Sequence, residues 1–219
     1  MKITLIDAGK RFNRDWIFRH LNYEFSADHS YAITGSNGSG KSTLLQAIAG
    51  AIGLSEGSIG YQAAAAQATA ARALSPDQVY RHLSLCAPYL EVIEEMTVTE
   101  FLTFHSSFKP LLPGHTIPDI IRRIGLESAA NKQIRFYSSG MKQRVRLAQA
   151  LFSDTPILLL DEPCTNLDAD GIALYRRLTA EYSRDRVLVI SSNDPQEYDF
   201  CEETINIMEY KGAAPAPIA

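Results

Sequence analysis

The chain has 219 residues, 46% of them hydrophobic, with a formal net charge of −4 and an isoelectric point of about 5.7. This length and apolar content are sufficient for one α/β domain with a substantial core. Because basic residues are not in excess, the composition does not favour nucleic acid or anionic lipid as the main partner, although it is compatible with a local basic patch.

The cysteines and the apolar runs bear on the cellular compartment. Cys86, Cys164 and Cys201 lack metal-ligand spacing, which predicts free thiols in a reducing compartment. The N-terminal segment 1–12 is broken by Asp7 before a signal peptide could form, and no run approaches the ~20 apolar residues of a membrane helix. We therefore expect a cytoplasmic chain, held at a membrane only through a partner.

Short β-rich segments open the chain. Lys2–Ile6 and Leu21–Phe25 predict strands, and Tyr31–Thr34 predicts a strand that enters a glycine-rich loop. Leu44–Ala49 then predicts a helix. The order of strand, glycine-rich loop and helix is typical of nucleotide-binding domains.

The glycine-rich loop fits the phosphate-binding pattern G-x-x-x-x-G-K-S/T. Its residues are Gly35, Ser36, Asn37, Gly38, Ser39, Gly40, Lys41, Ser42 and Thr43. The glycines let backbone N–H groups turn toward phosphates, Lys41 neutralises charge, and the Ser42 hydroxyl can ligate Mg²⁺ at a helix N-terminus. The loop predicts a nucleoside triphosphate site with Mg²⁺ as cofactor.

The middle of the chain predicts helices. The alanine-rich Gln62–Ser75 is expected to be a surface excursion, either frayed helix or loop, without chemistry of its own. Leu83–Ala87 predicts a buried strand. Helices are then expected from the Thr97 capping box to Phe108, over Pro118–Leu126 and over Gly140–Phe152. Residues 88–152 would thus form a helix-rich insertion.

Alternation of strands and helices resumes after Pro156. Strands are predicted at Ile157–Leu160, Arg186–Ser191 and Thr204–Met208, and a helix at Gly171–Tyr182. We expect a disordered tail at 212–219. Because the sequence has one phosphate loop and no evident repeat, it predicts a single domain over residues 1–211, with a core of 1–87 and 153–211.

Two carboxylates follow the apolar run Ile157–Leu160. The first, Asp161, is placed to hold Mg²⁺, mostly through water. The second, Glu162, can orient or deprotonate an attacking water. Because they accompany a phosphate loop, the pair favours metal-dependent hydrolysis of a triphosphate over two surface acids at a strand end.

The segment from Tyr137 to Val145 resembles the signature sequence of ATP-binding-cassette (ABC) ATPases, usually Leu-Ser-Gly-Gly-Gln. Ser138 and Gly140 are retained, whereas Tyr137, Ser139 and Met141 depart from it. A serine hydroxyl and N–H groups at a helix start make a second anion site. The resemblance implies an α/β P-loop NTPase of ABC type, whose mainly parallel core sheet carries an N-terminal antiparallel β subdomain and a helical subdomain.

Further landmarks of the ABC family follow in order along the chain. Phe12 stands where these ATPases place an aromatic ring that stacks on adenine, and Trp16 is a less well placed candidate. Asn166, Leu167 and Asp168 resemble the D-loop, which in the family crosses a dimer interface. A cap of the following helix by Asp168 or Asp170 is the alternative, and both can hold together.

Two positions depart from the family in ways that bear on mechanism. Pro88 stands where the family carries a glutamine that touches Mg²⁺, and proline has no side-chain oxygen. Glu91 either substitutes through a shifted loop or is a plain surface carboxylate. Asn193 replaces a histidine that contacts the γ-phosphate; an amide can donate that hydrogen bond but cannot gain a proton near neutrality.

The resemblance implies the ATP-hydrolysing subunit of an ABC transporter. Two chains, a homodimer or paralogues, would close around two ATP, so that Lys41 of one chain and the signature of the other grip one γ-phosphate, with Glu162 and Asn193 completing the catalytic set. A separate integral membrane permease would contact residues 88–152 at the cytoplasmic face of the inner membrane. Two alternatives remain: a soluble ABC ATPase of the cluster-assembly type, and a low-turnover nucleotide-gated subunit motivated by Pro88 and Asn193.

Overall fold

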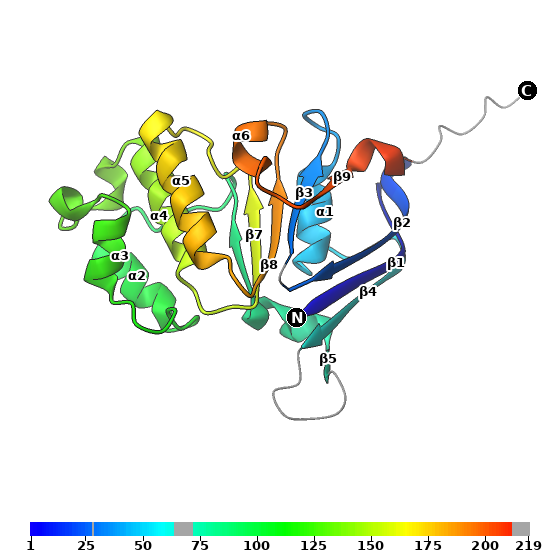
Figure 1. The fold of residues 1–219 in the computed structure, drawn as a ribbon, viewed down its shortest axis with the longest axis horizontal. Coiled ribbons are helices and arrows are strands. Elements are labelled where there is room, and N and C mark those ends of the chain that lie inside the picture. Colours follow the sequence, from blue (N-terminus) through cyan, green and yellow to red (C-terminus); the bar gives the residue numbers. More distant parts are fainter. Residues whose placement is uncertain (28, 64–71, 212–219) are drawn as a thin grey trace, which may run out of the picture.

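Two β-sheets of different kinds organise the chain, with one helix between them and a group of helices beside the larger sheet (Figure 1). The computed structural model describes residues 1–27, 29–63 and 72–211. Within these ranges, no helix combines the length and the apolar character that crossing a membrane requires.

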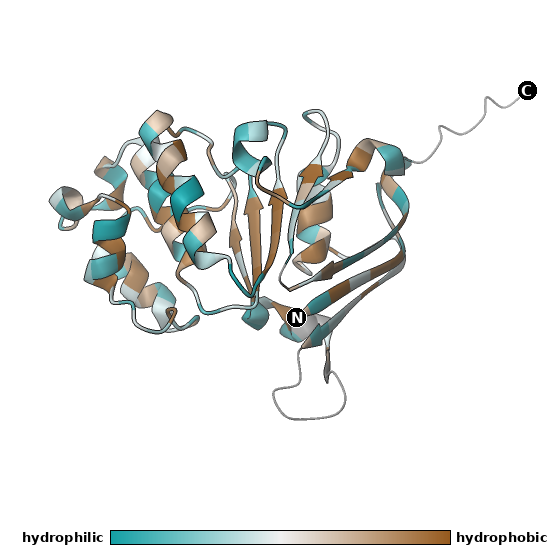
Figure 2. Ribbon diagram, viewed as in Figure 1, coloured by the Kyte–Doolittle hydropathy of each residue, from teal (hydrophilic) through white to brown (hydrophobic). Residues whose placement is uncertain are grey.

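The larger sheet has five parallel strands in the order β6-β7-β8-β3-β9. The strands are β3 (Ser30–Thr34), β6 (Leu83–Cys86), β7 (Ile157–Asp161), β8 (Val187–Ser191) and β9 (Glu203–Asn206). Every residue of β7 and β8 is buried, and both strands are hydrophobic along most of their length in Figure 2. Strands covered on both faces read as continuous apolar runs, which explains why these two were predictable.

The smaller sheet is antiparallel, with the order β2-β1-β4-β5. Its strands are β1 (Lys2–Phe12), β2 (Asp15–Ser26), β4 (Glu56–Ala63) and β5 (Arg72–Leu74). Both predicted N-terminal strands are longer than expected, because β1 and β2 continue through irregular pairing at Asp7 and His20, which have positive φ. Gly57 faces this bulge, and a Cβ there would lie 2.1 Å from the carbonyl oxygen of Asp7.

The prediction for Gln62–Ser75 is wrong at both ends of the segment. Gln62 and Ala63 close β4, and Ala63 pairs with Arg72 of the short strand β5. Hydrogen bonds between β4 and β5 satisfy the backbone polar groups of these residues. Low sequence complexity does not reveal such pairing. The rest of the alanine-rich stretch, 64–71, lies outside the described residues, as does the tail 212–219.

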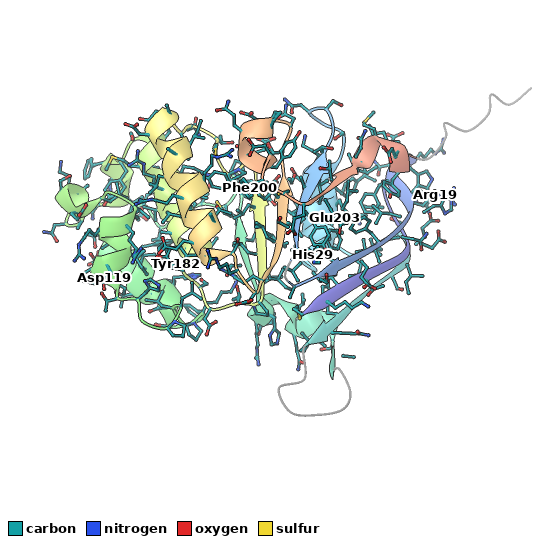
Figure 3. All side chains as sticks on the ribbon, in the orientation of Figure 1. Arg19, His29, Asp119, Tyr182, Phe200 and Glu203 are labelled. Atoms are coloured by element: carbon teal, nitrogen blue, oxygen red, sulfur yellow. The ribbon has the colours of Figure 1, made fainter. Side chains whose placement is uncertain are left out.

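Helix α1 (Lys41–Ile48) lies between the two sheets (Figure 1). Its Leu44, Leu45 and Ile48 are fully buried in a core that both sheets share. The two sheets also meet at Glu203 of β9, labelled in Figure 3, which accepts a 2.5 Å hydrogen bond from the hydroxyl of Tyr23 in β2. The N-terminal sheet therefore packs on the side of the core that carries α1.

Three helices of the group beside the larger sheet fall within residues 88–152. They are α2 (Val98–Ser106), α3 (Ile117–Arg123) and α4 (Ser139–Leu151), and α5 (Ala169–Tyr182) and the short α6 (Pro195–Tyr198) follow. The predicted capping box is confirmed: the Thr97 hydroxyl accepts from the N–H of Glu100, whose carboxylate accepts from the N–H of Thr97 at 2.8 Å. α2 and α3 both end two to three residues before their predicted ends.

The final predicted strand is too long. β9 ends at Asn206, whose side-chain oxygen accepts a 3.1 Å hydrogen bond from the N–H of Met208. This cap starts a 3₁₀ turn over Ile207–Tyr210. The sequence does not distinguish a continued strand from a 3₁₀ turn here, because an apolar residue such as the buried Ile207 suits both.

Aromatic packing and one buried arginine join the helices to the core. The rings of Phe152 and Tyr182 lie 4.5 Å apart, with His115 against both, and Figure 3 labels Tyr182 at the lower end of α5. Arg186 is buried and donates to the carbonyl oxygens of Thr155 and Leu151 at 2.7 and 2.9 Å. The guanidinium thus ties the end of α4 to the segment that enters β7.

We expect His105 to make stability depend on pH. Its Nε2 lies 2.8 Å from Ser153 Oγ, and burial beside Lys109 lowers the pKa of His105 to about 4. Between pH 6.5 and 4 the unfolded chain therefore binds a proton that the folded chain does not, so the free energy of unfolding falls as pH falls. Allowing for the partial exposure of the ring, we expect a loss of about 1 kcal/mol at pH 5 relative to pH 7.5.

Urea unfolding of the unchanged chain and of His105→Gln at both pH values measures this loss. The glutamine keeps a hydrogen-bond donor near Ser153 but does not titrate. The variant is expected to lose about 1 kcal/mol less than the unchanged chain. Equal losses would show that His105 does not control this pH dependence.

Candidate functional site

The phosphate loop joins β3 to α1 in a conformation that requires glycine. Gly35, Gly38 and Gly40 have φ values of 146°, 72° and 106°. A Cβ on Gly40 would lie 2.2 Å from Cγ2 of Ile17, so glycine is required there for space as well. Gly40 is the N-cap of α1 and supplies no side-chain cap, which leaves the first N–H groups of the helix available to an anion.

Lys41 is held above this loop by carbonyl groups. Its Nζ donates to the carbonyl oxygens of Gly35 and Ser36 at 3.0 and 3.2 Å, and the side chain is 4% exposed. No ion pair within residues 1–27, 29–63 and 72–211 involves this ammonium group. A buried positive charge that forms no ion pair in the described part of the chain, beside a helix N-terminus without a side-chain cap, favours a phosphate.

A cavity of about 330 Å³ opens over the loop. It is lined by Phe12, Ile17, Asn37, Gly38, Gly40, Lys41, Ser42, Thr43 and Glu162. Of the two aromatic candidates for the base, only Phe12 lies in this lining. Trp16 instead has the guanidinium groups of Arg19 and Arg11 over its ring, at 4.5 and 5.5 Å.

The carboxylate of Asp161 lies at the end of β7, inside the protein. Its side chain is 1% exposed, and Oδ1 has no hydrogen-bond partner in the part of the chain that the structure describes. Burial raises the pKa of Asp161, an effect that the hydroxyls of Ser191 and Ser42 and the charge of Lys41 oppose. A buried oxygen without a partner, next to a serine hydroxyl, fits the hard oxygen ligands that Mg²⁺ prefers.

Glu162 leaves the strand in a strained conformation. Its φ is 43°, in the left-handed region, and its N–H donates to the carbonyl oxygen of Ser191 on β8 at 2.8 Å. The side chain is half-buried and reaches the cavity over the phosphate loop. Strain at a single carboxylate beside a phosphate site is typical of catalytic groups.

The signature and D-loop residues line a second cavity, of about 420 Å³. Its lining includes Ser138, Ser139, Gly140, Met141, Asn166, Leu167 and Asp168, together with Arg144 and residues near Gly125. Ser138 caps α4 by accepting from the N–H of Met141 at 3.2 Å. Asp168 caps α5 in the same way, at 2.8 Å from the N–H of Gly171, so the expected cap is present.

Close backbone approach joins these two segments. A Cβ on Gly140 would lie 3.0 Å from the carbonyl oxygen of Asn166, and a guanidinium nitrogen of Arg144 lies 3.6 Å from Asp168 Oδ1. The lining of this cavity has no residue in common with the cavity over the phosphate loop. One chain therefore presents two separate cavities, each beside the start of a helix.

The two departing positions each follow a strand of the larger sheet. Pro88 follows the end of β6, and Glu91 is exposed, without an ion pair or side-chain hydrogen bond in the described residues. Asn193 is exposed two residues after Ser191, which pairs with Asp161 across the sheet. Asn193 thus stands at the same sheet edge as the phosphate loop, outside the lining of its cavity.

Two buried polar residues near the site were not predicted. Gln143 is 0% exposed in α4, and Glu197 is 4% exposed in α6. Helical spacing offered one signal for Gln143, since it lies four residues before the buried Leu147. Nothing local marks Glu197, because α6 is a single turn.

Comparison with known proteins agrees with this geometry. The family model described as ABC transporter matches residues 18–165. The chain is 31% identical to the uncharacterized ABC transporter ATP-binding protein YybJ of Bacillus subtilis, over 89% of this chain and 87% of that protein. It is 26% identical to the cytochrome c biogenesis ATP-binding export protein CcmA of Agrobacterium fabrum, over 93% and 94% of the two chains.

Solved structures share the fold at low identity. An ABC transporter ATP-binding protein of Pyrococcus furiosus superimposes with a TM-score of 0.81 at 20% identity, over 97% of this chain and all of that one. The bacterial ABC transporter cassette MJ0796, solved as a dimer, gives 0.74 at 22% identity, over 94% of each chain. The chain therefore belongs to the ATP-binding proteins of the ABC transporter family and has their P-loop α/β fold.

Proposed function

We propose that this chain is the ATP-hydrolysing subunit of an ABC transporter and works as a dimer that drives a separate membrane permease. The observation that carries the proposal is the pair of cavities, one at the phosphate loop and one at the signature, that share no lining residue. A chain that hydrolysed ATP alone would have no use for the second anion surface.

The phosphate-loop side of the site would bind the triphosphate. N–H groups of the loop and of the first turn of α1 would cradle the phosphates, and Lys41 would neutralise their charge. Ser42 and Asp161 would hold Mg²⁺, which supplies positive charge to the phosphate oxygens when bound. The exposed ring of Phe12, at the edge of the cavity, would stack on adenine.

Glu162 would act on the attacking water. Its carboxylate borders the cavity over the phosphate loop, and no other carboxylate is in that lining. There it would orient a water for in-line attack and accept its proton. Asn193 would donate a hydrogen bond to the γ-phosphate without exchanging a proton.

The second cavity would complete the site of a partner chain. Ser138 and the N–H groups of Ser139, Gly140 and Met141, at the start of α4, would bind the γ-phosphate of ATP held by the partner. The D-loop would lie at the same interface, since the carbonyl oxygen of Asn166 approaches Gly140 so closely that a Cβ there would lie 3.0 Å from it. The dimeric arrangement of the MJ0796 cassette supports this sharing, and the partner is a second copy or a paralogue.

Residues 88–108 would contact the permease. This segment exposes four large apolar side chains: Tyr89, Ile93, Phe104 and Phe108. Phe108 is 70% exposed, and its ring lies 5.0 Å from that of Phe104. Apolar surface of this kind marks an interaction site, and docking on a permease would place the chain at the cytoplasmic face of the inner membrane.

The alternatives are less well supported. Both relatives carry names of transport or export proteins, which favours transport over a soluble role of the cluster-assembly type. A low-turnover subunit would not need Glu162 at the phosphate cavity. Pro88 and Asn193 therefore stand as local changes in an active site.

Replacing Glu162 with glutamine is expected to trap the dimer. The amide keeps the shape of the carboxylate but cannot accept the proton of water, so ATP binds and is not cleaved. Size-exclusion chromatography with Mg²⁺ and ATP should show the dimer for Glu162→Gln and a mainly monomeric unchanged chain. The phosphate-release rate should fall at least about a hundredfold; an unchanged rate would remove Glu162 from the reaction.

Replacing Asp161 with asparagine should separate stability from metal binding. In the nucleotide-free chain the variant removes a buried charge whose Oδ1 accepts no hydrogen bond among the described residues, and burial of this charge outweighs the help of Ser191, Ser42 and Lys41, so the free energy of unfolding should rise by about 1 kcal/mol. Retention of ATP by the same variant should become independent of Mg²⁺. Urea unfolding and filter binding measure the two effects, with the exposed Asp154→Asn as control. A less stable variant that still responds to Mg²⁺ would contradict the assignment.

Isolation of the chain from its own cells tests the transport proposal. A tagged chain extracted in mild detergent is expected to retain a membrane protein with several spanning helices. Phe104→Ser combined with Phe108→Ser should reduce its recovery while leaving ATP binding intact, because the phosphate cavity contains neither ring. Recovery of a soluble scaffold protein instead would overturn the transport function.

A further inference from the structure

The peptide bond between Pro163 and Cys164 comes directly after Glu162 and is held from both sides. Its carbonyl oxygen accepts from Gln143, and its N–H donates to Glu197. We propose that Gln143 and Glu197 are positioning residues, a clamp on this peptide that fixes Glu162 and the start of the D-loop. This inference rests on the proposed hydrolysis by Glu162.

The first half of the clamp comes from the helix that begins at the signature. Nε2 of Gln143 in α4 lies 2.8 Å from the carbonyl oxygen of Pro163. The side chain is fully buried, so water cannot replace it. An amide lost from such a position leaves the carbonyl without a donor, which is costly in a buried site.

The second half comes from the segment that follows Asn193. Oε1 of Glu197 accepts from the N–H of Cys164 at 2.7 Å. The backbone of Glu197 is itself fixed, since its carbonyl oxygen accepts from the hydroxyl of Tyr175 in α5 at 2.7 Å. The ring of Tyr175 lies 6.3 Å from that of Phe200, which Figure 3 labels beside α5 and α6. The carboxylate is therefore anchored to two helices.

The clamped peptide controls two functional segments. On one side is Glu162, whose positive φ persists only where its surroundings impose it. On the other side are Asn166, Leu167 and Asp168, which line the signature cavity. A rotation of the 163–164 peptide would move the carboxylate and the D-loop together.

Arg146 extends the clamp to the segment after Pro88. One nitrogen of its guanidinium donates to Oε1 of Gln143 at 3.2 Å, and Nε donates to the carbonyl oxygen of Leu90 at 2.7 Å. Leu90 thus connects through Arg146 and Gln143 to the peptide after Glu162. Proline offers no side-chain group for this connection, and Arg146 provides one.

Hydrogen exchange and kinetics test the clamp with five variants. Gln143→Leu and Glu197→Leu remove the contacts at similar volume, while Glu197→Gln keeps an acceptor oxygen. Arg146→Met removes the link to Leu90. Gln149→Leu is the matched control, because it changes a glutamine of the same helix whose side chain has no hydrogen bond among the described residues.

Hydrogen exchange at the Cys164 amide reports on the clamp and does not require ATP hydrolysis. It should become at least about tenfold faster in Gln143→Leu and Glu197→Leu, and stay within about threefold in Glu197→Gln and Gln149→Leu. Arg146→Met should speed exchange in peptides covering both 90–95 and 162–168. Unchanged exchange in both leucine variants would overturn the clamp, and a rise confined to 90–95 would overturn the step through Arg146.

The kinetic readout separates positioning from folding. Each leucine variant should lower kcat at least about tenfold with the KM for ATP within about twofold, and Glu197→Gln should recover most of kcat. Faster exchange with unchanged kcat would overturn the positioning role. If one leucine variant does not fold, the other leucine variant and the exchange of 162–168 in Arg146→Met still test the clamp. An unchanged chain that fails to hydrolyse ATP would overturn the proposed function, while its exchange data would still test the clamp.

Discussion

Parallel pairing of β3, β7 and β8 is the constraint on which the site depends. Ser191 at the end of β8 pairs with Ile33 of β3 on one side and with Asp161 of β7 on the other. Because parallel strands end at one edge of the sheet, the phosphate loop, both carboxylates and Asn193 emerge together. Hydrogen bonds of the sheet thus bring into one place groups that are far apart in the sequence.

A second constraint is the strained exit from β7. At Glu162 the backbone turns out of the sheet with positive φ, and its N–H remains bonded to Ser191. Buried side chains from two neighbouring helices, Gln143 and Glu197, hold the next peptide. The sheet therefore fixes the backbone position of Glu162, and side chains from the two helices fix the direction of its carboxylate.

The sequence predicted what is local and failed where a partner lies far along the chain. The phosphate loop was predictable because its glycines and Lys41 act within one turn, and β7 because burial on both faces makes it apolar throughout. β5 was missed because its pairing with β4 follows from topology rather than composition. Glu197 was missed for the same reason: a polar residue in a four-residue helix gains its role only by meeting Cys164.

The separate cavities have a kinetic consequence. If each ATP needs the phosphate loop of one chain and the signature of another, turnover by free chains depends on the square of their concentration. Two chains held side by side by a third protein meet at an effective concentration near the millimolar range. Tethering alone would then make hydrolysis first order and confine it to assembled complexes. Free chains at low concentration would consume little ATP, although every group that the reaction needs is present in each of them.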